Sequence, residues 1–292
     1  MEIKYISKFS SLNFDNEPVN SFEYRGCYIQ KFAVGDIIRF QLIVDQNSDA
    51  YPSFPDLVLY NLSNNTSSLI TDIRIYNTDV GFLQYDVLVM DENSLLIEGI
   101  YQLNIRYFEG SRERIIATSF FGVYKETATE LLDTVRIDYT HNINEFDTIF
   151  LDGDRKAYYT LRVEGGFLGR EDSFGNSSNY FRDQYYFLKQ TSSLPYGIKS
   201  LTIGSRQGVP GWMGERINFI FSLDEVYVNA IRYVRSDSAV PEVNEIVDLY
   251  PYYVYKINIE QYDKRFVHDL HPTRTYLVNG EGFNYLLSFQ LG

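Results

Sequence analysis

The chain has 292 residues, of which 45% are hydrophobic, and 26 Lys and Arg against 39 Asp and Glu give it a formal net charge of −13. This length fits about two ordinary domains, and the hydrophobic share is large enough to build a core, which excludes a disordered chain. The negative charge argues against a protein that binds nucleic acid by neutralising phosphates. With 1 Cys and 3 His, an internal disulfide and a thiolate zinc cluster are excluded, and little is left for a histidine-based metal site.

The beginning of the chain and its hydropathy predict neither export nor a membrane span. Residues 1–8 lack a basic start followed by a long apolar run, so we expect no signal peptide. No stretch approaches 18 uninterrupted apolar residues. We therefore expect a protein that is made in the cytoplasm and is not exported through a signal of its own.

Alternation of apolar and polar residues predicts a set of short strands in the first part of the chain. The expected strands are residues 36–44, 56–62, 71–76, 84–89, 99–107 and 114–121. Many short strands with regular turns favour an antiparallel sandwich, and residues 95–103 have a loose likeness to a late strand of Ig-like domains. The polar residues 125–130 lack the strand period, so we predict an Ig-like sandwich domain over residues 1–125.

A second β-rich domain is expected over residues 126–292. Its predicted strands are residues 133–139, 157–164 (closed by Gly165 and Gly166), 199–204, 225–228, 230–234 and 253–260. Residues 169–180 are polar and predict the longest loop of the chain, either functional or mobile. The C-terminal residues 284–291 are expected to close the sheet or to pair with the edge of a neighbouring molecule.

One helix is predicted over residues 210–222, covering one end or face of the second sheet. Pro210 suits a first helical turn, and Met213 and Ile217 begin an apolar stripe that continues to Phe221. Trp212 is expected to anchor this helix in the core. The predicted fold is therefore mainly β, with two antiparallel sandwich-like domains and one short helix in the second.

Motifs that carry chemistry have simpler explanations in this sequence. The pair His268 and His271 would need a third zinc ligand, and the Pro that follows favours a polar loop instead. The Asp152-Gly153-Asp154 segment lacks the further oxygen ligands of a calcium loop and predicts a turn. Cys27 has no adjacent base and fits a small buried residue. A glycosidase pair could come from any two acids, but nothing selects one. We predict no enzyme activity and no catalytic, cofactor or metal site.

Two clusters of aromatic residues remain. The first follows the polar segment (Tyr180, Phe181, Tyr185, Tyr186, Phe187), and the second lies near the C-terminus (Tyr250, Tyr252, Tyr253, Tyr255). Aromatic side chains on strands pack in cores, anchor protein interfaces or stack on sugars, and the sequence leaves these three roles open, with the core first. The structural or interface candidates are Pro210, Trp212, Tyr180, Phe181, Tyr185, Tyr186, Tyr253 and Tyr255.

Several segments together resemble a group of uncharacterised phage and prophage structural proteins of Bacteroidetes, which are found among tail genes. The likeness is greatest over Leu201–Gly204, the Gly208-Val209-Pro210-x-Trp212 segment and the helix residues 217–222. It extends to Val163–Phe167, Phe181–Gln184, Ser193–Tyr196, Gly35–Phe40 and Asn144–Phe150.

The resemblance implies a virion protein, expected to be a ring, hub or adaptor subunit or a distal element of the tail. Its partners would be other copies of itself and neighbouring proteins of the tail and portal region, with no cofactor and no specific binding of nucleic acid. The alternative is a carbohydrate-binding or adhesin-like module that binds a cell-surface glycan through exposed aromatic residues.

Overall fold

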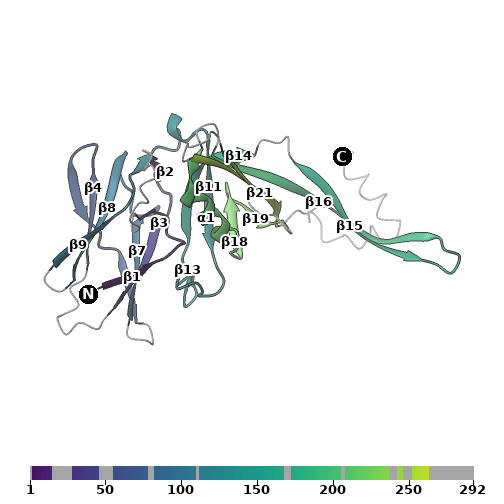
Figure 1. Ribbon diagram of the computed structural model, residues 1–292, viewed down its shortest axis with the longest axis horizontal. Coiled ribbons are helices and arrows are strands. Elements are labelled where there is room, and N and C mark those ends of the chain that lie inside the picture. The colour runs from purple at the N-terminus through teal and green to yellow at the C-terminus, as the bar shows by residue number, and fades with distance from the viewer. Residues whose placement is uncertain are drawn as a thin grey trace, which may run out of the picture. The chain divides into compact units, whose positions relative to one another are not determined.

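The computed structural model describes residues 2–14, 28–45, 55–77, 82–109, 112–167, 172–204, 208–236, 242–245 and 252–262. All of them fall within one compact unit that spans residues 1–262. The described part is mainly β, with mainly antiparallel sheets and one α-helix (Figure 1), and this confirms the predicted fold class.

Two facing sheets make up the first half, which we call the sandwich. The 4-stranded sheet contains, in order, β1 (Glu2–Ile6), β3 (Ile38–Asp45), β7 (Phe82–Met90) and β6 (Ile73–Asn77). The 6-stranded sheet contains β2 (Gln30–Ala33), β10 (Phe121–Tyr124), β8 (Gly99–Glu109), β4 (Asp56–Asn61) and β5 (Thr66–Leu69), with β9 (Arg112–Ala117) paired to β8. Apolar side chains of both sheets, such as Phe40 and Leu103, meet in one buried core. Alternation along strands such as β4 supplies the apolar face that this core requires, whereas β5 is exposed throughout.

A third sheet follows a short 3-10 helix, η1 (Thr129–Leu131). This 9-stranded sheet is formed by β11 (Thr134–Thr140), β14 (Tyr159–Phe167), β15 (Ser173–Arg182), β16 (Leu188–Ile203), β17 (Val209–Pro210), β18 (Glu225–Val228), β19 (Ile231–Arg235), β20 (Glu242–Glu245) and β21 (Tyr252–Gln261). Because β16 pairs with both β14 and β21, the strands β11, β14, β16, β21, β19 and β18 form a continuous ring. We call this ring the closed sheet. That residues 1–125 and 126–292 fold as separate domains stays a prediction.

The predicted helix is present as α1 (Gly211–Ile220) and packs against the core of the closed sheet. Pro210 occupies the N-cap position with a φ of −61°, so the helix begins directly after it. Met213 and Ile217 are fully buried. At Gly214 a Cβ atom would lie 2.3 Å from a ring carbon of Tyr255, so glycine allows the helix to approach β21.

The predicted loop over residues 169–180 is wrong from residue 173 onward. Ser173–Arg182 is strand β15, which pairs antiparallel with β16, and the predicted strand at residues 199–204 is only the end of β16. Ser, Asn and Gly have low strand propensity, so pattern alone favours a loop here. Pairing with the neighbouring strand overrides that preference. We call the resulting hairpin, Ser173–Ile198, the arm.

Two smaller predictions have different outcomes. The turn at Asp152–Asp154 is confirmed, because β12 (Leu151–Asp152) and β13 (Arg155–Lys156) form a hairpin around Gly153, which has a φ of +60°. The end of a strand at Gly165 is wrong, since β14 continues to Phe167. Cys27, His268, His271 and residues 284–291 lie outside the described residues.

Candidate interaction surface

The arm is a direct continuation of the closed sheet. Between Ile198 and Ile203, β16 pairs with β21. Between Leu188 and Ile198 it pairs with β15. Figure 1 shows the two strands of the arm running outward from the closed sheet. One uninterrupted strand, β16, therefore belongs to both the closed sheet and the arm.

Large apolar side chains of the arm are exposed rather than buried. Their exposed fractions run from 55% to 85%, for Phe174, Tyr180, Phe181, Tyr185, Tyr186, Phe187, Leu188 and Leu194. The favoured core role of the first aromatic cluster is therefore wrong. The reason is that within the described residues no second layer covers the two strands of the arm, so alternation along them creates no inside.

The tip of the arm is held by a defined set of hydrogen bonds. The Asp183 carboxylate accepts from the backbone N–H groups of Tyr185, at 2.9 Å, and of Phe187, at 3.0 Å. The carbonyl of Asp183 accepts from the Tyr186 N–H at 2.9 Å. Tyr186 has a φ of +64°, a left-handed conformation that is uncommon for a bulky residue. The tip therefore presents its three aromatic rings in an organised turn.

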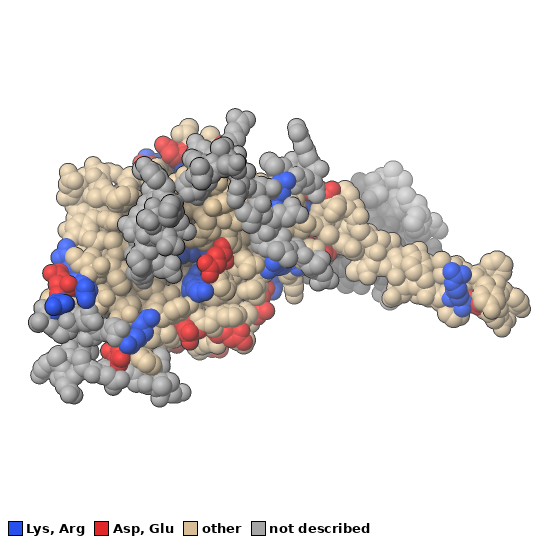
Figure 2. All heavy atoms as spheres, in the orientation of Figure 1, with Lys and Arg blue, Asp and Glu red and all other residues tan. Residues whose placement is uncertain are grey.

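The arm also carries little charge. Arg182, Asp183 and Lys189 are the only charged residues between Ser173 and Ile198. Lys189 lies 3.4 Å from the Asp183 carboxylate, which neutralises part of this charge. Figure 2 shows the arm, at the right of the view, as mostly uncharged apart from one group near its tip. An exposed, apolar and weakly charged surface of this kind is the usual mark of a protein interface.

The second aromatic cluster is placed differently. Tyr255 is buried in the core of the closed sheet, and Tyr253 packs against that core half-buried. Tyr252 is half-buried with its ring 6.4 Å from that of Tyr28, while Tyr250 lies outside the described residues. Trp212 is also half-buried, with its ring edge-on to Tyr28 and the Arg216 guanidinium 4.8 Å from the ring centre. Tyr255, Tyr253 and Trp212 therefore pack in or against the core of the closed sheet, and only the candidates of the arm face solvent.

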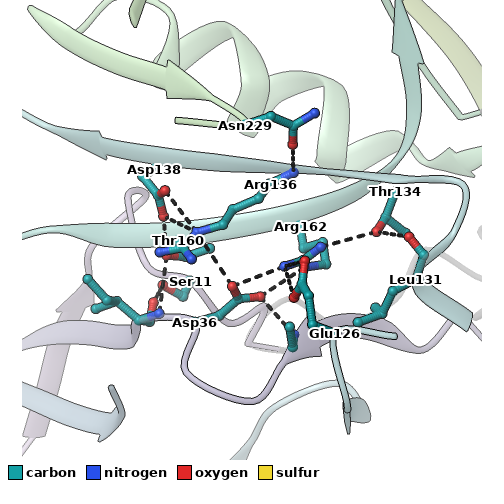
Figure 3. Close-up of polar contacts among 12 residues, drawn as sticks. Ser11, Asp36, Glu126, Leu131, Thr134, Arg136, Asp138, Thr160, Arg162 and Asn229 are labelled. Carbon is teal, nitrogen blue, oxygen red and sulfur yellow. Dashed lines mark hydrogen bonds and ion pairs between the residues drawn. The ribbon is translucent and has the colours of Figure 1, made fainter. Parts of the chain in front are cut away.

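Sequence reasoning also missed a polar network that joins the sandwich to the closed sheet, which we call the joint (Figure 3). At its centre Arg162 of β14 donates to both carboxylate oxygens of Asp36, at 2.9 Å and 3.2 Å. Asp36 lies in the turn between β2 and β3 and also accepts from the Ala33 N–H at 2.8 Å. The exposed fractions of the two side chains are only 4% and 1%. A buried charge pair is stable only when its hydrogen bonds are satisfied, and this one meets that condition.

Neighbouring groups extend the joint on both sides. Arg162 donates to Glu126 at 3.0 Å, and Arg136 donates to Asp138 at 2.9 Å. Burial acts to lower the pKa of the Arg162 guanidinium, but the bonds and charges of Asp36 and Glu126 outweigh it and raise this pKa. A hollow of about 520 Å³ opens over the network. The charged groups of the joint are bonded to one another, so the joint holds the sandwich and the closed sheet together.

The described residues contain no group of three or more His, Cys, Asp or Glu side chains that could hold a metal ion. None of the described helices has the length and apolar character needed to cross a membrane.

The sequence contains a weak signal for the arm and none for the joint. The run Tyr185-Tyr186-Phe187-Leu188 stands inside a polar segment, and such an apolar run beside turn residues could have indicated an exposed tip. Asp36 and Arg162 are 126 positions apart, and each resembles an ordinary surface charge in its own segment. The chain matches no protein-family model, no curated protein and no solved structure.

Proposed function

We propose that this protein is a non-enzymatic structural subunit of a phage virion, a ring, hub, adaptor or distal element of the tail, and that it assembles through the arm. The observation that carries the assembly role is the ordered arm with exposed aromatic side chains and little charge. The assignment to a phage tail rests on the sequence resemblance described above. Its partners would be other copies of the chain and neighbouring tail proteins, and its place would be the virion.

The size of the arm supports an assembly role. Aromatic side chains bury about 150–250 Å² each. Six of them at the exposures found here offer on the order of 800 Å² over the whole arm, which equals the share of one partner in a stable interface when all of it is covered. A two-stranded hairpin by itself is only marginally stable in water. Burial against a partner would supply the second layer that the described residues do not provide for the arm.

The first experiment compares the full chain with a variant that lacks the arm. Ser173 and Ile198 are directly opposite in the ladder, so an Asn-Gly turn can replace residues 174–197 and close the hairpin at its base. We expect the intact chain to form a defined oligomer by native mass spectrometry at micromolar concentration, and the variant to be monomeric with an unchanged thermal transition. An intact chain that stays monomeric across this range would contradict the assembly role.

The virion assignment needs its own test. Quantitative mass spectrometry of purified phage particles, induced from a lysogen where necessary, should find the chain at a fixed number of copies per particle. Its absence from intact particles would contradict the tail assignment, whatever the oligomeric state of the isolated protein.

A second candidate function is favoured by the tip itself, where Tyr185 and Tyr186 are exposed by 70% and 81%. Exposed aromatic rings stack on sugars, as in carbohydrate-binding or adhesin-like modules. A glycan array with the intact chain tests this function. Specific binding that is lost in Tyr185→Ala and Tyr186→Ala would favour the glycan-binding role over assembly.

A further inference from the structure

Exposed apolar side chains lie on both faces of the arm. Residues directly opposite in an antiparallel ladder share a face, and successive residues alternate between faces. Phe181 and Leu194 therefore lie on one face, because Leu194 is opposite Ser177. Phe174, Tyr180 and Leu188 lie on the other, because Leu188 is opposite Arg182. We call these the Leu194 face and the Phe174 face.

Each face has features of a surface that is covered in the assembled state. Leu194 is exposed by 61% and Phe181 by 55% on one face, and Phe174 by 85% and Tyr180 by 57% on the other. An antiparallel sheet covered on one side normally keeps a polar face toward water. Apolar side chains on both faces indicate that a partner covers each of them.

We infer that the arms of successive copies stack on one another, with the Leu194 face of one arm against the Phe174 face of the next. This inference rests on the proposed assembly function and specifies its geometry. The occupant of each face is a second copy of this chain.

Charge favours another copy's arm as the occupant. Two copies that each carry −13 repel one another overall. The arm contributes nothing to this net negative charge, since two basic residues and one acidic residue are its only charged residues. Small side chains between the apolar ones, such as Ser177 and Ser178, allow two arms to approach closely.

Stacking of unlike faces has a consequence for symmetry. Each copy uses one face to bind the preceding copy and the other to bind the following one, so the contact is heterologous. Such contacts form a ring if the rotation between copies closes, and an open filament if it does not.

Blocking one face at a time tests the geometry. One variant carries Phe181→Glu and Leu194→Glu, and the other carries Phe174→Glu and Tyr180→Glu. We expect each variant alone to be monomeric, and an equimolar mixture to form a dimer with one copy of each, because one intact pair of faces remains between them. Native mass spectrometry separates the two chains by mass.

A charge-matched control keeps the test specific. Leu69→Glu with Ile97→Glu places two carboxylates on the sandwich at side chains that are exposed by 65% and 64%. This variant should assemble like the intact chain, and all variants should keep its thermal transition because the changed side chains are exposed.

The alternatives give different results. If one face variant alone forms a dimer while the other does not, like faces pair and the stacking geometry is overturned. If the intact chain assembles but the mixture stays monomeric, the arm binds a different surface of the next copy, and the inference fails while the proposed assembly function stands. If the intact chain does not assemble at all, the assembly function itself fails.

Discussion

The arm and the joint distribute polar and apolar groups in opposite ways. The arm leaves Phe174 and Tyr186 in solvent, whereas the joint buries the charges of Asp36 and Arg162. In a folded chain large apolar side chains are ordinarily buried and charged side chains exposed, so both regions reverse the usual distribution. Burial of the charges in the joint is compensated, because each buried charged group there has a partner within the same molecule.

The arm finds no such partner in the described residues. Its two strands pair with each other and its tip is organised around Asp183, yet no residue that the structure describes covers its large apolar side chains. The charged groups of the joint find their partners within the molecule, whereas the apolar side chains of the arm are expected to find theirs on another molecule. Changes in the joint should therefore alter stability, and changes in the arm should alter assembly.

The largest effect on stability is expected from removing one partner of the joint. Arg162→Ala leaves the Asp36 carboxylate buried, and loss of one member of a buried pair costs about 3–5 kcal/mol. Urea unfolding should show this decrease in the free energy of unfolding. The combined change Asp36→Asn and Arg162→Met removes both charges and should cost at least about 1 kcal/mol less than Arg162→Ala. Equal losses in the two variants would mean that the charge pair does not hold the joint.

The pairing of β14 with β16 in the closed sheet supplies a more local test. Gly165 has a φ of +145°, and a Cβ atom there would lie 2.1 Å from the Thr202 carbonyl oxygen, where β14 passes β16. Gly165→Ala should destabilise the closed sheet by about 2 kcal/mol or more. The neighbouring Gly166 is the control, because its Cβ would meet only a Val135 carbon at 4.0 Å. Gly166→Ala should change the free energy of unfolding by less than about 0.5 kcal/mol, and similar losses in both would contradict the steric explanation.

These two regions also show what sequence reasoning reached. Alternation located most strands, and the Pro210 signal with the stripe from Met213 located α1, because both patterns are local. Residues 169–180 predict a loop because Ser, Asn and Gly are frequent there, and only the pairing with β16 makes residues 173–182 a strand. The closure of the sheet and the Asp36–Arg162 pair depend on residues far apart in the chain, which a single sequence does not bring together.

Acidic pH should lower the stability of the closed sheet through Glu225 of β18. Burial acts to raise the pKa of this carboxyl, but the hydrogen bond and charge of Lys156 outweigh it and lower the pKa below its ordinary value. A lowered folded pKa gives stability that is present above the unfolded pKa and is lost as the pH falls through the folded pKa. In thermal melts between pH 7 and pH 3, the advantage of the intact chain over Glu225→Gln should therefore shrink toward the acid end. An advantage that is constant with pH would contradict this prediction.

Asp86 should behave in the opposite sense. Burial raises the pKa of its carboxyl, with Arg39 and Gln41 only partly opposing it. A raised folded pKa in an acid means that ionisation costs stability at neutral pH and that this cost disappears as the pH falls through the folded pKa. Relative to Asp86→Asn, the intact chain should therefore gain stability as the pH falls. The same series of melts checks this, and a change in the same direction as for Glu225 would contradict it.

The smallest change in stability is expected at the tip of the arm, where effects on stability and effects on assembly can be told apart most clearly. Tyr186 has a φ of +64° and its ring is exposed by 81%, so glycine should relieve backbone strain while little packing is lost. We expect Tyr186→Gly to leave the free energy of unfolding unchanged or raised by up to about 1 kcal/mol, and at the same time to weaken assembly measured by native mass spectrometry.

Tyr185→Gly is the matched control for Tyr186→Gly. Tyr185 is also exposed but is not among the residues with positive φ, so glycine there removes a ring without relieving strain and should lower the free energy of unfolding slightly. Both changes should weaken assembly, because both remove an exposed ring. If Tyr186→Gly gains stability and loses assembly, the strained backbone at Tyr186 is kept because its ring contacts another molecule. Weaker folding with intact assembly would reverse that conclusion and assign the tip to the fold of the arm alone.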